Sequence, residues 1–149
     1  MRLVVQRVDS ARVTVDGKLA GSIKTGLLVF TGFGDMDKPA VIPLMIRKLI
    51  ELRIFGDSGG KINLSLKDVR GSILVVSQFT LYANCSRGRR PDFTHAAPPD
   101  LARQLYEQFL SELKDTGTEV QSGIFGAHMQ VDACNNGPFT IILDSAVVT

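Results

Sequence analysis

Runs of β-branched and other hydrophobic residues recur along most of the chain and predict a protein built largely of β-strands. The first run covers residues 3–8. The next two flank Asp16-Gly17, a pair that favours a tight hairpin because glycine tolerates a positive φ. Residues 26–34 (GLLVFTGFG) are almost continuously apolar and end in glycines, which predicts a buried strand.

Two segments instead repeat hydrophobic residues at helical spacing. The first covers residues 41–52; Pro39 suits an initial turn, and Asp37 is a candidate for the cap. The second covers residues 100–114 and follows two consecutive prolines. Each helix therefore has one apolar face that must pack on something else.

The rest of the chain returns to strand-like patterns. Further strands are predicted at residues 53–55, 61–66, 72–82, 118–124, 127–134 and 139–143. The run at 72–82 (SILVVSQFTLY) is the longest and is predicted to be central, whereas residues 83–97 predict an irregular loop. Neither a repeat nor a linker interrupts the pattern. We therefore expect a single α+β domain over residues 1–149, a largely antiparallel sheet, curved or barrel-like, with two packed helices.

Composition narrows the setting of the protein. A length of 149 residues, with 44% hydrophobic and 21% charged residues, suits one globular domain. The net charge of +2 does not by itself indicate a nucleic-acid partner. The sequence has neither a signal-peptide pattern nor an apolar run of the roughly 18 residues that a membrane span needs. Cys85 and Cys134 are expected to be free thiols, so a cytoplasmic protein without a membrane partner is predicted.

The common catalytic patterns are missing from the sequence. His95 and His128 lie near no nucleophile-elbow motif, and G-x-S-x-G does not occur. The His, Cys, Asp and Glu residues do not follow metal-ligand spacing. The sequence thus predicts neither a metal site nor a cofactor, and function must rest on other features.

The first of these features is Ser77-Gln78-Phe79-Thr80, which ends a very apolar run. These residues can belong to an edge strand whose hydroxyls face water. They can also form a strand end that presents backbone N–H groups and side-chain donors to an ester carbonyl.

The second feature is Asn135-Asn136-Gly137-Pro138. These are turn-forming residues, so a simple turn between two strands is one interpretation. A Gly-Pro bond can also be cis, which would make a rigid backbone wall suited to rejecting one stereoisomer.

A third feature is the most basic stretch of the chain, formed by Arg87, Arg89 and Arg90. It is either a solvated loop or a contact for the phosphates of a nucleic acid.

On these residues the chain resembles the D-aminoacyl-tRNA deacylase family. Residues 77–81 match the family motif SQFTL, and residues 135–140 match its NNGPFT motif. The flanking segments MRLVVQRV, LRIFGDSGGKINLSL, GRRPDF and TIILDS extend the similarity over essentially the whole chain. The resemblance implies a hydrolase that cleaves the ester of D-aminoacyl-tRNA, a proofreading step in translation. It also implies activity on glycyl-tRNA mischarged on tRNA-Ala, and a homodimer with active sites at the subunit interface.

The resemblance also assigns roles to individual residues. Gly137 and Pro138, joined by a cis bond, would hold the substrate amino group and exclude an L side chain. Arg7 would steady their loop.

The resemblance further implies which residues of this chain line the pocket and bind or cleave the substrate. Gln78 and Thr80 are the candidate catalytic residues, with Ser77 and Phe79 beside them. Phe125 and Met129 would line the adenosine pocket, and the three loop arginines would contact tRNA phosphates.

The chemistry is open at this stage. Thr80 could be a nucleophile, but no base lies beside it in the sequence, so positioning by backbone groups, with a ribose hydroxyl helping to activate water, is preferred. Two rival functions remain: a non-catalytic RNA-binding module, and a small-molecule esterase or amidase that uses Thr80.

Overall fold

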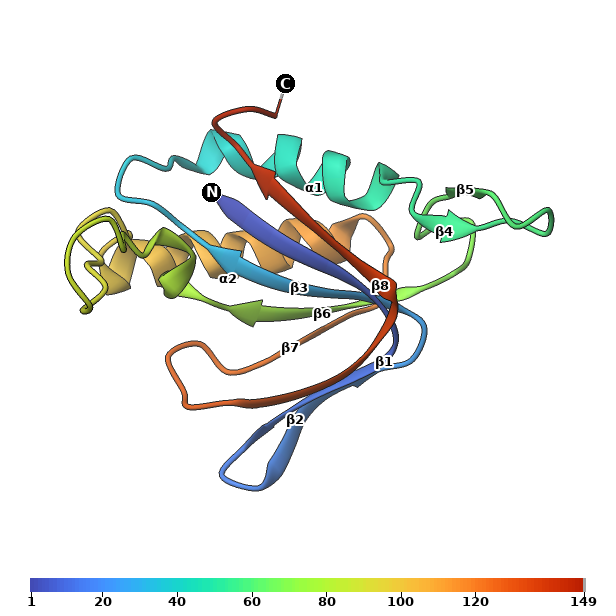
Figure 1. The fold of residues 1–149 in the computed structure, drawn as a ribbon, viewed down its shortest axis with the longest axis horizontal. Coiled ribbons are helices and arrows are strands. Elements are labelled where there is room, and N and C mark those ends of the chain that lie inside the picture. Colours follow the sequence, from blue (N-terminus) through green and yellow to red (C-terminus); the bar gives the residue numbers. More distant parts are fainter. Residues whose placement is uncertain (149) are drawn as a thin grey trace.

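A six-stranded mixed sheet is the centre of the fold in the computed structural model, which describes residues 1–148 (Figure 1). The sheet contains β1 (Arg2–Val15), β2 (Lys18–Ile23), β3 (Gly26–Gly32), β6 (Ser72–Ser77), β7 (Val120–Ser122) and β8 (Gln130–Asp144). A separate hairpin joins β4 (Phe55–Gly56) to β5 (Ile62–Leu64). The helices are α1 (Ile42–Glu51) and α2 (Pro99–Asp115), with short 3₁₀ turns η1 (Pro39–Val41) and η2 (Phe79–Tyr82). Residue 149, where the predicted domain ends, lies outside the described residues.

Strand β1 organises the sheet because it pairs along both of its edges. It is antiparallel to β8 on one side, and to β3 and then β2 on the other. Strand β6 pairs in parallel with β3 and with β7. Parallel neighbours need long crossovers, and the segments containing α1 and α2 make these two connections. The sheet curls strongly toward a barrel (Figure 1), so the predicted α+β domain with two packed helices is confirmed.

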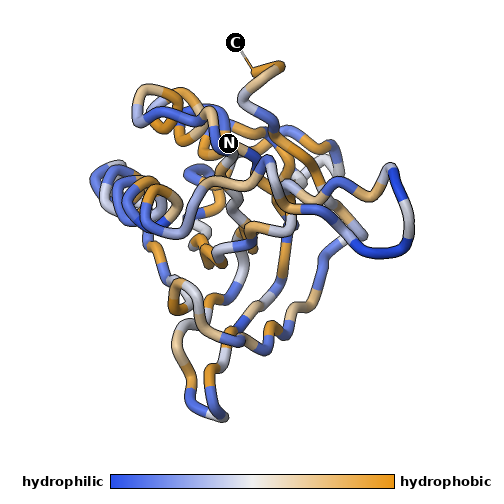
Figure 2. Tube along the Cα trace, turned by 90° about the vertical axis from the view of Figure 1, so that its left-hand side faces the viewer, coloured by the Kyte–Doolittle hydropathy of each residue, from blue (hydrophilic) through white to orange (hydrophobic). Residues whose placement is uncertain are grey.

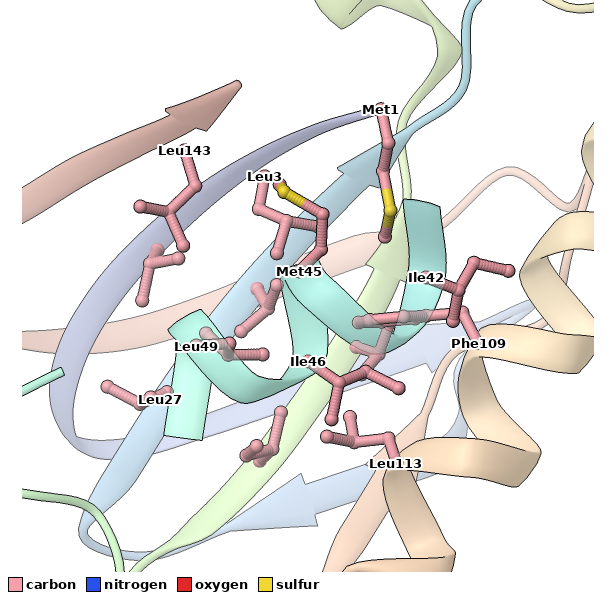
Figure 3. Packing of buried hydrophobic residues seen from close by; sticks show 14 of the residues in the cluster. Met1, Leu3, Leu27, Ile42, Met45, Ile46, Leu49, Phe109, Leu113 and Leu143 are labelled. Atoms are coloured by element: carbon pink, nitrogen blue, oxygen red, sulfur yellow. The ribbon is translucent and has the colours of Figure 1, made fainter. Parts of the chain in front are cut away.

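The hydrophobic core has two parts, one on each face of the sheet. The larger part lies between the sheet and the helices, where Phe109, Leu49 and Met45 are fully buried (Figure 3). The smaller part fills the concave face and includes Val13 and Leu74. Hydrophobic and hydrophilic positions alternate around both helices (Figure 2), as amphipathic helices require. Within the described residues, none of the helices is long and apolar enough to cross a membrane.

Several sequence predictions are corrected by the structure. The separate runs predicted at 3–8 and 13–15 form one strand, β1. The strand predicted at 72–82 ends at Ser77, and residues 79–82 form the 3₁₀ turn η2 instead. At Gly32, the end of β3, a Cβ would lie 2.7 Å from the Gln78 carbonyl oxygen. The chain therefore turns over this glycine, where a larger residue would block it. Asp37 caps neither η1 nor α1, because its carboxylate accepts hydrogen bonds from the Gly34 amide and the Tyr82 hydroxyl.

A further correction concerns the C-terminal strands. The segments predicted at 127–134 and 139–143 belong to one strand, β8, with the expected turn replaced by a bulge. This is possible because β1 is long enough to pair with both halves. Residues 118–124 shorten to the three residues of β7.

Candidate active site

A cavity of about 630 Å³ opens where β3 and β6 end. Five of the predicted site residues line it, namely Ser77, Gln78, Phe79, Phe125 and Met129. Sequence reasoning did not assign the other lining residues, which include Thr31, Phe33, Phe93, Pro98 and His128. Phe93 ends the GRRPDF segment, so its position in a family-like segment was the available signal. The walls are mostly apolar and aromatic, which suits the burial of a flat ring.

The polar groups of this cavity come from the end of β6. The Gln78 amide donates to the Thr31 carbonyl at 2.8 Å, which fixes the point where the strand stops. The amides of Phe79 and Thr80, which begin η2, have no hydrogen-bond acceptor among residues 1–148. Two adjacent unpaired N–H groups can stabilise negative charge on a carbonyl oxygen.

Thr80 is exposed and lies beside the cavity without lining it. Its hydroxyl accepts a hydrogen bond from the Gln78 side-chain amide. Among the described residues, that hydroxyl has no histidine or carboxylate within hydrogen-bond distance. An unassisted threonine hydroxyl is a weak nucleophile, so the geometry favours a positioning role.

The opposite wall is formed by the segment between β7 and β8. Phe125 packs against Tyr106 of α2, with 5.5 Å between ring centroids, and lies under the Arg103 guanidinium. The Tyr106 hydroxyl donates to the Val75 carbonyl of β6 at 3.2 Å. Met129 packs over Gly123, where a Cβ would lie 2.5 Å from its sulfur. The aromatic wall is therefore tied to both α2 and the sheet.

Tyr82, the last residue of η2, anchors this turn to Asp37 and Arg2. Its hydroxyl donates to Asp37 at 3.2 Å, and the Arg2 guanidinium lies 4.6 Å from its ring centroid. Arg2 also donates to the Leu81 carbonyl at 3.0 Å. Burial, together with the negative charge of Asp37, raises the pKa of Tyr82 well above its ordinary value, so the phenol stays protonated and keeps donating.

The Gly-Pro motif forms a bulge at the middle of β8. One residue of β1 lies between Gln6 and Val8, whereas residues 136–139 lie between their partners on β8. The extra residues protrude, and both Gly137 and Pro138 are exposed. The peptide bond between them is cis, as the family resemblance implies.

Arg7 lies on β1 directly opposite this bulge and contacts it. Its Nε donates to the Asn136 carbonyl at 2.9 Å, and its Nη1 donates to the Ile54 carbonyl at 2.5 Å. Its guanidinium also stacks on the Phe139 ring, 4.7 Å from the centroid. A Cβ added at Gly137 would lie 3.3 Å from Nη2 of Arg7 and 2.7 Å from the Phe139 amide nitrogen. Arg7 therefore contacts the bulge through Asn136 and Phe139 and, through Ile54, the connection that follows α1.

One copy of the chain does not bring its two motifs together. Ser77 is level with Leu3 of β1 through the pairing across β3, while the bulge lies opposite Arg7. Four residues along a strand correspond to roughly 13 Å, and three strand spacings separate β6 from β8 by roughly 14 Å. In Figure 1 β6 ends at the left and β8 bends at the right. Within one chain, the SQFT motif and the Gly-Pro bulge therefore lie far apart.

The three arginines lie on an exposed loop beside the cavity. Two backbone hydrogen bonds between Asn84 and Asp92, at 2.7 and 3.0 Å, close the loop. Phe93 follows directly and packs edge-on against Phe79, with ring centroids 5.0 Å apart. Among residues 1–148, no carboxylate forms an ion pair with any of these arginines. The same part of the chain contains no group of three or more side chains suited to holding a metal ion.

Comparisons with known proteins relate the chain to one family. Residues 4–144 match the family model described as D-Tyr-tRNA(Tyr) deacylase. A protein of Thermotoga petrophila named D-aminoacyl-tRNA deacylase is 53% identical over 146 residues, 98% of each chain. One of the same name from Thermosipho africanus is 51% identical over 148 residues, 99% of each chain. A solved structure described as c-Myc DNA Unwinding Element Binding Protein is similar with a TM-score of 0.91 and 40% identity, over 97% of this chain and 98% of the other.

Proposed function

The chain belongs to the D-Tyr-tRNA(Tyr) deacylase family, and we propose that it hydrolyses the ester of D-aminoacyl-tRNA to free tRNA and a D-amino acid. This reaction is a chiral proofreading step in translation. The observation that carries the proposal is the cavity at the end of β6, where unpaired amides lie beside an aromatic slot. We expect the protein to act in the cytoplasm, where aminoacyl-tRNA is used.

A second copy of the chain completes the site in this proposal. The exposed Gly137-Pro138 bulge of one subunit reaches into the cavity that Ser77, Gln78 and Phe79 line in the other. Support comes from the distance between the two motifs within one chain and from the exposure of the bulge. Such a homodimer should bury on the order of 1,200 Å² or more of surface in total.

Selection against L-substrates follows from the bulge in this arrangement. The carbonyls of Gly137 and Pro138 accept hydrogen bonds from the substrate α-amino group, and the backbone leaves no space for an L side chain. Selectivity then comes from exclusion and not from attraction for D side chains. Glycine has no side chain to exclude, so glycyl-tRNA mischarged on tRNA-Ala should be cleaved as well.

The chemical step needs no protein nucleophile. Water, deprotonated with help from the neighbouring ribose hydroxyl of the tRNA, adds to the ester carbonyl carbon. The amides of Phe79 and Thr80 stabilise the resulting oxyanion, and the ester oxygen leaves with a proton as the ribose hydroxyl. Gln78 and Thr80, hydrogen-bonded to each other, position the ester. Phe125 and Met129 pack against the terminal adenosine.

Binding of the rest of the tRNA depends on charge. Arg87, Arg89 and Arg90 lie on a loop anchored next to the cavity mouth by Phe93. In this proposal they contact the phosphates that precede the terminal adenosine. Such contacts position the substrate without distinguishing bases.

Three substrates separate this function from its rivals. The wild-type protein is incubated with D-tyrosyl-tRNA, L-tyrosyl-tRNA and the methyl ester of D-tyrosine, and free tyrosine is measured. The proposal requires release from D-tyrosyl-tRNA alone. Binding without release would indicate an RNA-binding module, and cleavage of the methyl ester at a similar rate would indicate a small-molecule esterase.

A further inference from the structure

Thr31 carries a buried polar atom that the fold itself does not use. Thr31 is 1% exposed, and among residues 1–148 its Oγ1 is the one buried side-chain polar atom without a hydrogen-bond partner. The buried hydroxyl of Tyr106, in contrast, donates to the Val75 carbonyl. A buried hydroxyl without a partner destabilises a fold, whereas valine has nearly the same shape and no polar atom. Threonine at this position should therefore lower the free energy of unfolding relative to valine, so its presence is not explained by the stability of the fold.

The position of Thr31 connects this hydroxyl to the candidate site. Residues Leu27 and Val29, which alternate with it on the helix-facing side of β3, are fully buried in the core. Thr31 is the next residue on that side, and it lines the cavity beside Ser77, its pairing partner on β6. Its carbonyl accepts from the Gln78 amide at 2.8 Å, so its backbone is fixed where the motif begins.

The surroundings of the hydroxyl indicate what kind of ligand group would meet it. The cavity walls nearby are aromatic or apolar, with Phe33, Phe79, Phe93 and Phe125 among them. Flat aromatic walls are suited to stacking an unpaired base, and a base edge needs hydrogen-bond partners in such a place. A threonine hydroxyl can both donate and accept, and an adenine edge presents both a donor and an acceptor.

We propose that Thr31 is a base-recognition residue whose hydroxyl forms a hydrogen bond with the edge of the terminal adenine of the substrate tRNA. This inference rests on the proposed function, because that function supplies a terminal adenosine next to the ester. It assigns to Thr31 a task in substrate binding, which explains a hydroxyl that the fold leaves without a partner. The hydroxyl would lower the stability of the free protein and raise its affinity for the tRNA terminus.

The test combines two variants with two ligands. Thr31→Val removes the hydroxyl and keeps the shape, and Thr31→Ser keeps the hydroxyl. Inhibition constants against D-tyrosyl-tRNA hydrolysis are measured for the trinucleotide CCA and for an analogue whose terminal ribose has no base. Thr31→Val should raise the inhibition constant of CCA by about 3- to 10-fold, as expected for the loss of one neutral hydrogen bond, and leave the inhibition constant of the abasic analogue unchanged. Thr31→Ser should retain most of the CCA affinity.

A thermal unfolding measurement keeps a structural role distinguishable. Thr31→Val should raise the Tm by about 2–4 °C, because an unpaired buried polar atom is lost. A lower Tm would mean that the hydroxyl has a partner in the protein, and the proposal would be wrong. Equal effects on CCA and the abasic analogue, or no effect on either, would also overturn it. If wild-type protein released no D-tyrosine at all, the proposed function would fail instead.

Discussion

Gly34 packs tightly against Tyr82, which supports the turn η2 at the candidate site, so replacing the glycine should lower both stability and activity. A Cβ at residue 34 would lie 2.6 Å from Cε1 of Tyr82, and ordinary contact begins at 3.4 Å. The ring must therefore move by about 0.8 Å, the difference between these two distances. Arg2 lies over the same ring, 4.6 Å from its centroid, so the ring cannot move without changing that contact.

The size of the effect follows from the contacts that Tyr82 would lose. Its hydrogen bond to Asp37 contributes about 0.5–1.5 kcal/mol, and the contact with the Arg2 guanidinium about 0.5–1 kcal/mol. Gly34→Ala should thus destabilise the protein by about 1–2.5 kcal/mol. Because Tyr82 ends the turn that begins with Phe79 and Thr80, kcat/KM should also fall by about 10- to 100-fold.

The assay pairs urea unfolding with deacylation of D-tyrosyl-tRNA. Gly56→Ala is the matched control, because a Cβ there meets nothing within 4 Å, and it should change neither quantity appreciably. Adding Tyr82→Leu makes room for the new methyl group, so Gly34→Ala should cost much less in that background. Strictly additive costs, or a Gly34→Ala variant as mild as the control, would refute the packing argument.

Three further predictions concern chemistry, charge and pH. Thr80→Ala should lower kcat less than about 100-fold and Thr80→Ser should change it little, since a nucleophile's removal would cost several powers of ten; a trapped acyl-threonine would contradict this. Replacing all three loop arginines by alanine should weaken the binding of every tRNA alike and flatten the dependence of log Kd on log salt. An unchanged slope would mean that the loop does not contact phosphates. Burial alone raises the pKa of Asp144, but hydrogen bonds from the Ala146 amide and the Arg2 side chain outweigh it and hold that pKa below its ordinary value. The ionised form therefore stabilises the fold above about pH 4, and this contribution is lost as pH falls further; the Tm of Asp144→Asn should drop less steeply in acid than that of the wild type, and equal slopes would argue against it.

The sequence predicted most of the elements because periodicity reports which face of an element is buried. On that basis it predicted both helices, β2, β3 and, as two separate runs, the two halves of β1. It failed at the C-terminal end of β6 and in the middle of β8, where long-range contacts decide the conformation. The turn after Ser77 depends on the space above Gly32, and the bulge at 136–139 depends on the length of β1 opposite it. Neither feature is visible in a local pattern.

The candidate site also combines residues that the sequence identified with residues that only long-range contacts bring into place. The SQFT and GP motifs were identifiable because they resemble a family, and five motif or pocket residues do line one cavity. Thr31 and Phe93 went unassigned because each looks ordinary in sequence, one as a polar residue in an apolar strand and the other as part of a loop. Only the pairing of β3 with β6 and the packing on Phe79 bring them to the site.

The claim that two copies of the chain build one active site is tested most directly by mixing two inactive variants. One carries Gly137→Val, which obstructs the bulge, since even a Cβ there would lie 2.7 Å from the Phe139 amide nitrogen. The other carries Phe125→Asp, which places a charge in the aromatic wall of the cavity. Each variant alone should hardly release D-tyrosine from D-tyrosyl-tRNA. After the subunits are exchanged in mild denaturant, one of the two sites in each mixed dimer combines the intact cavity of the Gly137→Val subunit with the intact bulge of the Phe125→Asp subunit. Activity should then return to a substantial fraction of the wild-type value. Mixed dimers, verified by affinity tags on both subunits, that stay as inactive as the single variants would show that each site is built within one chain.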